Sequence, residues 1–296
     1  MEKVISSVKN LLKPVLCLFL RLLPNAVFRS LFVKAPRLLP YCPQNRKFVF
    51  NAYLKDIKVN VHTVYPIERE MLAGYYDKSM LGVIDNFVKK GDVCFDIGAN
   101  VGPVSFALAK KSGSEGQVFA FEPGRLIYNR LMDNIRLNPE YGKIIQPYKT
   151  GFSDKTEARD WNEDKTNRGN AGFIIQGPNQ EERVELITVD DFVREQRVKK
   201  LDFIKIDVEG MEYEVIKGAR KTLEEQKPTL YYETGFFEKG FWAEIARGEQ
   251  VILFIEQLLI GMGYGIYKQE GESLRETRYP DLSYNTIAIW RGREAL

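Results

Sequence analysis

From about residue 90 onward, short apolar runs typical of buried strands alternate with segments in which apolar residues recur at helical spacing. The expected strands lie at residues 93–97, 117–122, 144–152, 203–208 and 229–233, and the expected helices at 103–111, 126–137, 213–223 and 251–262. Such alternation predicts an α/β fold, a doubly wound parallel sheet with helices on both faces. Two late strands, 264–267 and 286–290, have no obvious helix between them and predict an antiparallel hairpin at one edge.

The segment between the two halves of this pattern is polar and rich in Gly and Asn. It contains a short apolar piece at residues 173–175, which we expect to pair as a hairpin with the alternating run at 184–189. Thr188 and Asp191 stand three residues apart before an apolar residue, a spacing typical of a helix capping box.

Charge divides the chain of 296 residues into two parts. Residues 1–40 carry a net charge of +6, so the other residues carry −3 of the total of +3. A basic segment on a mildly acidic body argues against general nucleic-acid binding, which needs a basic face on the domain itself. We therefore expect an N-terminal helical segment, 1–40, that serves as an interaction arm, and one catalytic domain, 41–296.

The first 40 residues are apolar but interrupted by Pro14, Arg21 and Pro24, so a continuous membrane span is not expected. They also lack the cleavage pattern of a signal peptide. Four basic residues, Lys9, Lys13, Arg21 and Arg29, form a narrow stripe that suits a helix lying in a membrane interface. The alternative is a helical pair that packs on the body of the protein.

The three cysteines are widely spaced and form neither a disulfide framework nor a zinc pattern. Cys94 lies in an apolar run and is expected to be a core residue. A reducing compartment, the cytoplasm, is the expected location, at a membrane surface if the basic arm binds one.

The segment from Asp96 to Gly102 lies between a buried strand and a helix, where glycines let the backbone turn tightly and approach a ligand. The dinucleotide fingerprint is absent, because Asn100 and Pro103 occupy two of its positions. The Asp96 carboxylate would repel a pyrophosphate and would suit the ammonium group of an amino acid. The loop therefore favours an adenosyl amino acid over NAD, the alternative being a purely structural turn.

Glu122 ends the next strand, 24 residues after Gly98. A carboxylate about 20 residues after the glycine loop is placed to accept hydrogen bonds from both ribose hydroxyls. The alternative is a solvated loop acid.

A third acidic segment lies at the end of the expected strand 203–208. Strand alternation places Lys205 and Asp207 on the same side, and Asp207 and Glu209 lie where the strand ends. These acids are expected to face the same crevice as Asp96 and Glu122. The alternative is a helix cap and a solvated loop acid.

Together these segments resemble the FkbM-type methyltransferases, over about residues 80–235. The resemblance is carried by 96–102, Phe121-Glu122-Pro123, 188–192, 203–210, Glu212 and Gly218-Ala219. It implies a class I methyltransferase (Rossmann-like) seven-stranded sheet, S-adenosylmethionine as methyl donor, and usually O-methylation of a small polar acceptor such as a sugar or natural-product hydroxyl. The segments outside 80–235 are expected to shape the acceptor site.

The resemblance also implies roles for individual residues. Residues expected to bind the cofactor are Asp96, Gly98, Asn100, Gly102, Glu122, Ser153 and Asp154. Asp207, assisted by Lys205, is the expected catalytic residue, able to orient an acceptor hydroxyl or take its proton. Glu209 and Glu233 are expected near the acceptor, and with Asp207 they could ligate a hard cation.

Other readings remain open at this point. His62, the only histidine, is a candidate base outside the shared core. An NAD-dependent oxidoreductase and a non-catalytic, membrane-associated scaffold with a methyltransferase fold are the alternative functions.

Overall fold

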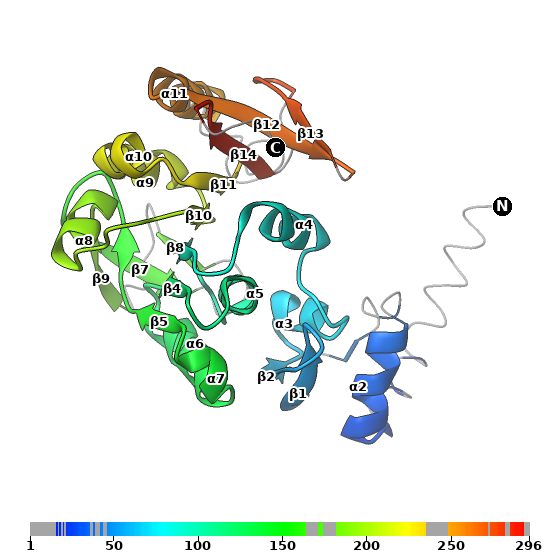
Figure 1. Ribbon diagram of the computed structural model, residues 1–296. Coiled ribbons are helices and arrows are strands. Elements are labelled where there is room, and N and C mark those ends of the chain that lie inside the picture. Colours follow the sequence, from blue (N-terminus) through cyan, green and yellow to red (C-terminus); the bar gives the residue numbers. More distant parts are fainter. Residues whose placement is uncertain are drawn as a thin grey trace.

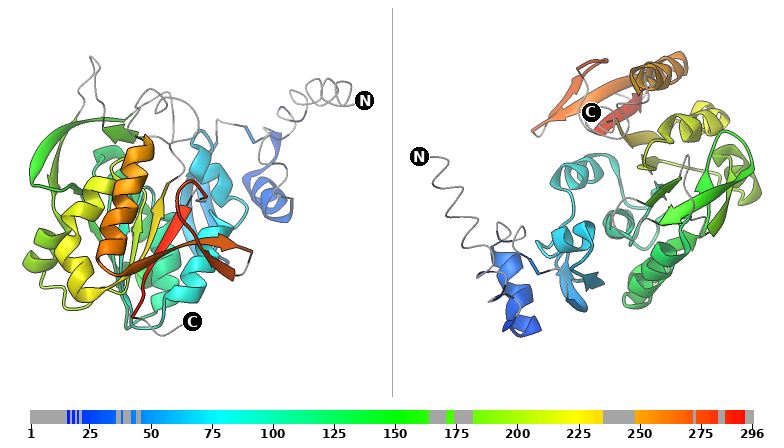
Figure 2. Two further views of the ribbon diagram at one scale, coloured as in Figure 1. Left: turned by 90° about the horizontal axis from the view of Figure 1, so that it is seen from above. Right: turned by 180° about the vertical axis from the view of Figure 1, so that it is seen from behind.

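The computed structural model describes residues 22–35, 46–163, 171–173, 182–234, 248–271, 273–281 and 285–292, and the short pieces 16, 18, 20, 38 and 42–43. Within this part, an eight-stranded sheet carries helices on both faces (Figures 1 and 2). In spatial order the strands are β13 (Ser273–Glu276), β12 (Tyr264–Glu270), β14 (Asn285–Trp290), β11 (Thr229–Glu233), β10 (Phe203–Ile206), β3 (Val93–Ile97), β4 (Gln117–Phe121) and β5 (Ile145–Tyr148). Strands β11 to β5 are parallel, which confirms the predicted doubly wound fold.

The sheet grows in both directions from β3. Strands β4 and β5 add on one side of β3, whereas β10 and β11 add on the other side. In open α/β sheets, ligands bind beyond the carboxyl ends of the strands at such a switch point. The register pairs Lys205 with Asp96, so the two expected acidic segments lie next to each other.

Both faces of the parallel strands are buried because successive residues enter two different clusters. Cys94, Val118 and Phe203 pack on the face covered by α4 (Lys78–Phe87) and α5 (Pro103–Ser112). Their neighbours Phe95 and Phe119 pack on the opposite face. Four helices cover that face: α8 (Val189–Glu195), α9 (Glu212–Gly218), α10 (Arg220–Gln226) and α11 (Gly248–Gly261). Cys94 is fully buried, as predicted.

The antiparallel edge differs from the prediction. The two late strands do pair with each other, but β14 is inserted between β12 and β11. An additional strand, β13, pairs antiparallel with β12 and forms the outer edge, so the sheet has eight strands rather than seven. Strand β13 has only one apolar residue, Leu274, and its other residues are exposed. It therefore lacks the alternating apolar pattern from which a strand could be predicted.

A second, four-stranded sheet has the order β6 (Gly151–Phe152), β9 (Glu182–Ile187), β7 (Glu157–Glu163), β8 (Ala171–Phe173). The predicted hairpin between the piece at 173–175 and the run at 184–189 is wrong. Strand β7 lies between β8 and β9 and pairs antiparallel with both. Its polar sequence has no apolar alternation that would have predicted a strand.

Helix bounds agree with the expected segments to within a few residues, with one exception. The remaining helices on the sheet are α6 (Arg125–Arg136) and α7 (Pro139–Gly142). The helix expected at 213–223 is divided into α9 and α10 at Ala219, whose backbone φ of −101° and ψ of 3° depart from helical values. The Thr188 hydroxyl oxygen accepts a hydrogen bond from Asp191 N at 2.9 Å, which confirms Thr188 as an N-cap.

The N-terminal part adds α2 (Asn25–Lys34), the hairpin of β1 (Lys47–Tyr53) and β2 (Ile57–His62), and α3 (Pro66–Met71). Phe28 and Phe32 of α2 are fully buried, and the Arg46 guanidinium lies 4.3 Å from the Phe28 ring centroid. The described part of this segment thus packs on the rest of the protein, which was one of the two alternatives predicted for residues 1–40. Among the described residues, no helix has the length and apolarity to cross a membrane.

Candidate active site

A cavity of about 350 Å³ opens at the carboxyl ends of β3, β4, β10 and β11. Its walls include the loop after β3, Glu122 after β4, the loop from Asp207 to Glu209 after β10, and Glu233 at the end of β11. Residues preceding α4 complete it on another side. The sequence-predicted acids at the ends of different strands are therefore brought together, as the switch-point rule requires.

The glycine loop is shaped by two close approaches. Gly98 has φ +79°, and a Cβ there would lie 1.9 Å from the carbonyl oxygen of Asp207. Gly102, with φ +94°, is the N-cap of α5, and a Cβ there would lie 2.7 Å from Leu131. Asn100 also adopts positive φ, and its Oδ1 accepts a hydrogen bond from Val101 N at 2.8 Å. These residues set the backbone that lines the cavity.

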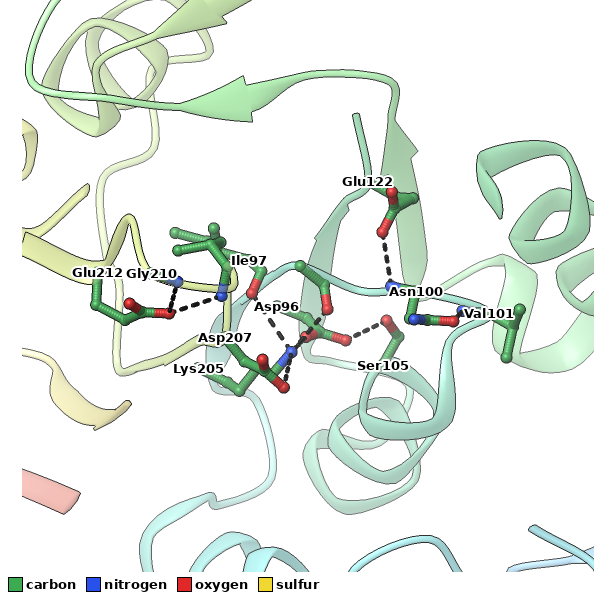
Figure 3. Close-up of polar contacts among 12 residues, drawn as sticks. Asp96, Ile97, Asn100, Val101, Ser105, Glu122, Lys205, Asp207, Gly210 and Glu212 are labelled. Carbon is green, nitrogen blue, oxygen red and sulfur yellow. Dashed lines mark hydrogen bonds and ion pairs between the residues drawn. The ribbon is translucent and has the colours of Figure 1, made fainter. Parts of the chain in front are cut away.

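Glu122, in the loop after β4, is hydrogen-bonded to the loop after β3 (Figure 3). Its two carboxylate oxygens accept hydrogen bonds from Asn100 N and Gly124 N, each at 3.0 Å. The side chain is 4% exposed and lies in the cavity wall. Glu122 therefore places a carboxylate, a group that only accepts hydrogen bonds, at the cavity.

Lys205, which lines the cavity, lies between two carboxylates (Figure 3). Its Nζ is 3.3 Å from Asp96 Oδ1 and 3.5 Å from Asp207 Oδ2, and it donates to Gly98 O at 2.7 Å. Burial lowers the pKa of Lys205, but Asp207 and Asp96 outweigh burial and raise the pKa above its ordinary value. Lys205 is therefore a buried cation rather than a proton acceptor, and the expected placement of Lys205 and Asp207 on one side is confirmed.

Asp96 and Asp207 differ in access to the cavity. Asp96 is fully buried, its Oδ2 accepts from Ser105 Oγ at 2.5 Å, and it is outside the cavity wall. Its expected contact with an ammonium group remains a prediction, and in this geometry the ammonium group beside it is that of Lys205. Asp207 has a side chain that is 36% exposed and lies in the cavity wall.

The loop after β10 contains two further acids. Glu209 adopts φ +56° and lines the cavity, and burial, followed by the Asp207 carboxylate, raises its pKa to about 8. Glu212 lies just beyond the loop, and its Oε1 accepts from Val208 N at 3.0 Å and Gly210 N at 3.3 Å. Burial is the main cause that raises the pKa of Glu212 to about 7.

Ser153 and Asp154, expected at an adenine ring, lie outside the cavity wall. Asp154 forms an ion pair with Lys217 at 2.6 Å, and the Ser153 carbonyl packs so closely on Gly218 that a Cβ there would be 2.2 Å away. These residues dock α9 on the second sheet. Thr150, Gly151 and Phe152, immediately before them, line the cavity instead.

Sequence reasoning missed Tyr76 and Asp77, which contribute to the cavity from the start of α4. An acid before a helical run is an N-cap signal, but nothing in the sequence relates this cap to a crevice formed by later strands. His62, in contrast, is outside the cavity wall, and burial, followed by Arg130, lowers its pKa to about 4. Among the described residues, no group of three His, Cys, Asp or Glu side chains could hold a metal ion.

The strand order defines the class of protein. Five parallel strands grow both ways from β3, and the antiparallel β14 is inserted between β11 and β12. With a glycine loop after β3 and an acid at the end of β4, this is the class I S-adenosylmethionine-dependent methyltransferase fold.

The family model for the methyltransferase FkbM domain matches residues 96–266, more than half of the chain. The chain belongs to the FkbM methyltransferase family.

Two curated relatives are similar to part of this chain. Hexuronic acid methyltransferase AglP of Haloferax volcanii is 29% identical over 136 residues, which cover 46% of this chain and 53% of AglP. Methyltransferase sdnD of Sordaria araneosa is 27% identical, with 42% of this chain and 58% of sdnD covered. The chain thus spans about half the length of the curated relatives it matches.

Among solved structures, the FkbM methyltransferase from Methylobacillus flagellatus is 16% identical, with a TM-score of 0.46 and coverage of 77% of this chain and 54% of that one. An O-methyltransferase from Thermotoga maritima is 13% identical, with a TM-score of 0.42 and coverage of 86% and 88%.

The cavity residues suit S-adenosylmethionine, the cofactor of this class. Glu122 presents an oriented carboxylate, the group predicted to accept the ribose hydroxyls, and the loop after β3 presents backbone at the place where glycines allow close approach. In the described wall the only basic side chain is Lys205, which is paired with Asp96 and Asp207. A phosphate-free nucleoside fits this wall, whereas the pyrophosphate of NAD would meet carboxylates without a cation to neutralise it.

Proposed function

We propose that this chain transfers the methyl group of S-adenosylmethionine to a hydroxyl oxygen of a sugar or a similar polyhydroxylated natural product. The observation that carries the proposal is the Asp207 carboxylate, which lines the cavity while Lys205, 3.5 Å away, holds it from below. A carboxylate fixed in this way can accept the hydrogen bond of an acceptor hydroxyl and aim that oxygen at a methyl group.

S-adenosylmethionine supplies an electrophilic methyl group on a sulfonium sulfur. The acceptor oxygen forms a bond to that carbon as the carbon–sulfur bond breaks, and the hydroxyl proton passes to Asp207 or to water. Glu209, with its pKa raised to about 8, is protonated at neutral pH and can donate a hydrogen bond to a second acceptor oxygen. Because an alcohol is a weak acid, positioning of the two reactants contributes much of the rate.

The carbohydrate part of the proposal is supported by one relative. AglP is a hexuronic acid methyltransferase, and it is 29% identical to this chain over 136 aligned residues. We infer a carbohydrate acceptor for this chain from that relationship, together with the several carboxylates in the cavity, which suit hydroxyl donors.

The test is incubation of the purified chain with S-adenosylmethionine carrying an isotopically labelled methyl group and a library of glycosides. We expect a labelled product that survives mild alkali, because an ether is stable where a methyl ester is hydrolysed. An alkali-labile or nitrogen-bound methyl group would contradict the O-methylation of a hydroxyl.

With the acceptor in hand, Asp207→Asn should lower turnover by about 10²–10⁴-fold, the range of general acid–base assistance. Affinity for S-adenosylmethionine should change much less, which calorimetry can measure. Asp133→Asn, an exposed change on α6, is the matched control. Turnover near wild type in Asp207→Asn would exclude Asp207 from the chemistry.

A further inference from the structure

One wall of the cavity comes from residues that precede the family match. Tyr76 and Asp77, together with Pro66, Ile67 and Met80, line the same cavity as Asp207 and Glu233. The match to the FkbM family begins only at residue 96. This wall is therefore formed by residues outside the family match.

The Tyr76–Asp77 wall is held rigidly. Asp77 is the N-cap of α4, and its Oδ1 accepts from Ser79 N at 2.8 Å and Met80 N at 3.2 Å. The Ser79 hydroxyl donates to Gln269 Oε1 at 2.9 Å, which braces the start of α4 against β12. Met80, Val83 and Ile84 of α4 are buried in the core.

Tyr76 lines the same cavity as the Asp77, Asp207 and Glu233 carboxylates. Burial, followed by the charges of Asp207, Glu70, Asp77 and Glu233, raises the pKa of Tyr76 well above its ordinary value. Tyr76 therefore remains a neutral phenol at physiological pH, able to donate one hydrogen bond and accept others.

The described wall of the cavity is acidic. Its carboxylates are Asp77, Glu122, Asp207 and Glu233, against the single cation Lys205, while Glu209 is neutral at physiological pH. Since Lys205 is buried and paired with Asp96 and Asp207, it offers no charge to an acceptor. An acceptor with a carboxylate or phosphate at this place would meet like charges in a partly desolvated site, where repulsion is stronger than in water.

We propose that Tyr76 and Asp77 form the acceptor-binding wall and select a hydroxyl-rich acceptor without negative charge. Tyr76 and Asp77 would bind acceptor hydroxyls beside the one that Asp207 orients. The inference rests on the proposed function and adds to it the charge of the acceptor, which distinguishes this chain from a hexuronic acid methyltransferase.

The experiment compares labelled methyl transfer to three sets of glycosides that differ in charge: neutral hexosides, hexosaminides and hexuronosides. We expect kcat/KM for neutral hexosides to exceed that for hexuronosides by at least about tenfold. Equal use of neutral and anionic sets, or preference for hexuronosides, would overturn the inference while leaving hydroxyl methylation intact. Transfer to none of the three sets would instead contradict the proposed function, and the inference with it.

Two variants assign the selection to this wall. Asp77→Asn keeps the helix cap, because Asn caps helices as well as Asp does, but removes the charge. It should reduce the discrimination against hexuronosides at least threefold, with unchanged affinity for S-adenosylmethionine as the evidence of folding. Tyr76→Phe should raise KM for neutral hexosides more than it lowers kcat. Asp85→Asn, on the exposed side of the same helix, is the control and should alter neither quantity. Wild-type discrimination in Asp77→Asn together with wild-type KM in Tyr76→Phe would show that another wall selects the acceptor.

Discussion

At the scale of single residues, the site depends on backbone contacts that tolerate no larger side chain. Gly98 lets the loop after β3 approach the Asp207 carbonyl, so the loop after β3 and the loop after β10 contact each other directly. Lys205 donates to the carbonyl of Gly98 from beneath. The position of Asp207 is thus set by Lys205 and Gly98 together, not by its own strand alone.

Glu122 carries the prediction for cofactor binding. Glu122→Ala removes an oriented carboxylate that we expect to accept hydrogen bonds from the ribose, so affinity for S-adenosylmethionine should fall by roughly 1.5–3 kcal/mol, the scale for hydrogen bonds to charged groups. Calorimetric titration measures this loss, with Glu140→Ala, an exposed acid on α7, as control. Unchanged affinity would show that Glu122 only organises the loop through Asn100 N and Gly124 N.

At the scale of elements, the turn from β10 to α9 joins Asp207, the proposed catalytic residue, to the second face of the sheet. Its backbone includes two residues with positive φ, Glu209 and Gly210, and Glu212 satisfies two of its N–H groups. The Glu212 side chain is 3% exposed, so its ionised form is costly to bury. The turn therefore links local stability to pH.

The sign of this linkage follows from the direction of the shift. The pKa of Glu212 is about 7 in the folded chain against an ordinary value of 4.5, so between these values the folded state binds more protons than the unfolded state. The stabilising contribution is present below pH 4.5 and is lost as pH rises through 7.

Glu212→Gln keeps an oxygen that can accept both N–H groups but cannot ionise. Relative to wild type, this variant should gain stability as pH rises from about 5 to 8, by no more than about 3 kcal/mol. Urea unfolding of both proteins at several pH values measures the difference. Glu224→Gln, at an exposed position on α10, should show no such trend. A stability difference independent of pH would contradict the role assigned to Glu212.

At the scale of the whole molecule, the N-terminal segment presents two sides. Leu20, Phe28 and Phe32 are buried in the core, whereas Leu22 and Val27 are 77% and 51% exposed. Burial of one side shows packing on the body, and the exposed side leaves room for the predicted contact with an anionic membrane. Lys9, Lys13 and Arg21 of the predicted basic stripe lie outside the described residues.

Point changes test this contact better than deletion of residues 1–40, because deletion would also remove Phe28 and Phe32 from the core. We expect the full chain to co-sediment with anionic lipid vesicles at low salt, since each basic residue near such a surface contributes about 1 kcal/mol. Replacing Leu22 and Val27 by Gln should release it, whereas Leu126→Gln, an exposed apolar residue on α6, should not. Failure of the full chain to sediment would leave packing as the only role of this segment.

Local sequence patterns were sufficient to predict the doubly wound α/β fold, the cofactor class and most of the acids that line the cavity. These follow from local signals: both faces of a parallel strand are buried, so the strands are continuous apolar runs, and function lies at their carboxyl ends. The glycine loop, Glu122 and the Lys205–Asp207 pair were all readable because each lies within a few residues of a strand end.

Other features became apparent only in the three-dimensional structure, because they depend on contacts between residues distant in sequence. Strand β13 and the polar strand β7 form because neighbouring strands offer their hydrogen-bonding edges, not because of an apolar pattern of their own. The ion pair of Asp96 with Lys205 and the close packing of Ser153 on Gly218 likewise join residues that are distant in sequence. Tyr76 and Asp77 reach the cavity because α4, which follows them, packs on strands that come later in the sequence. Such contacts depend on distances between elements, which no local pattern encodes.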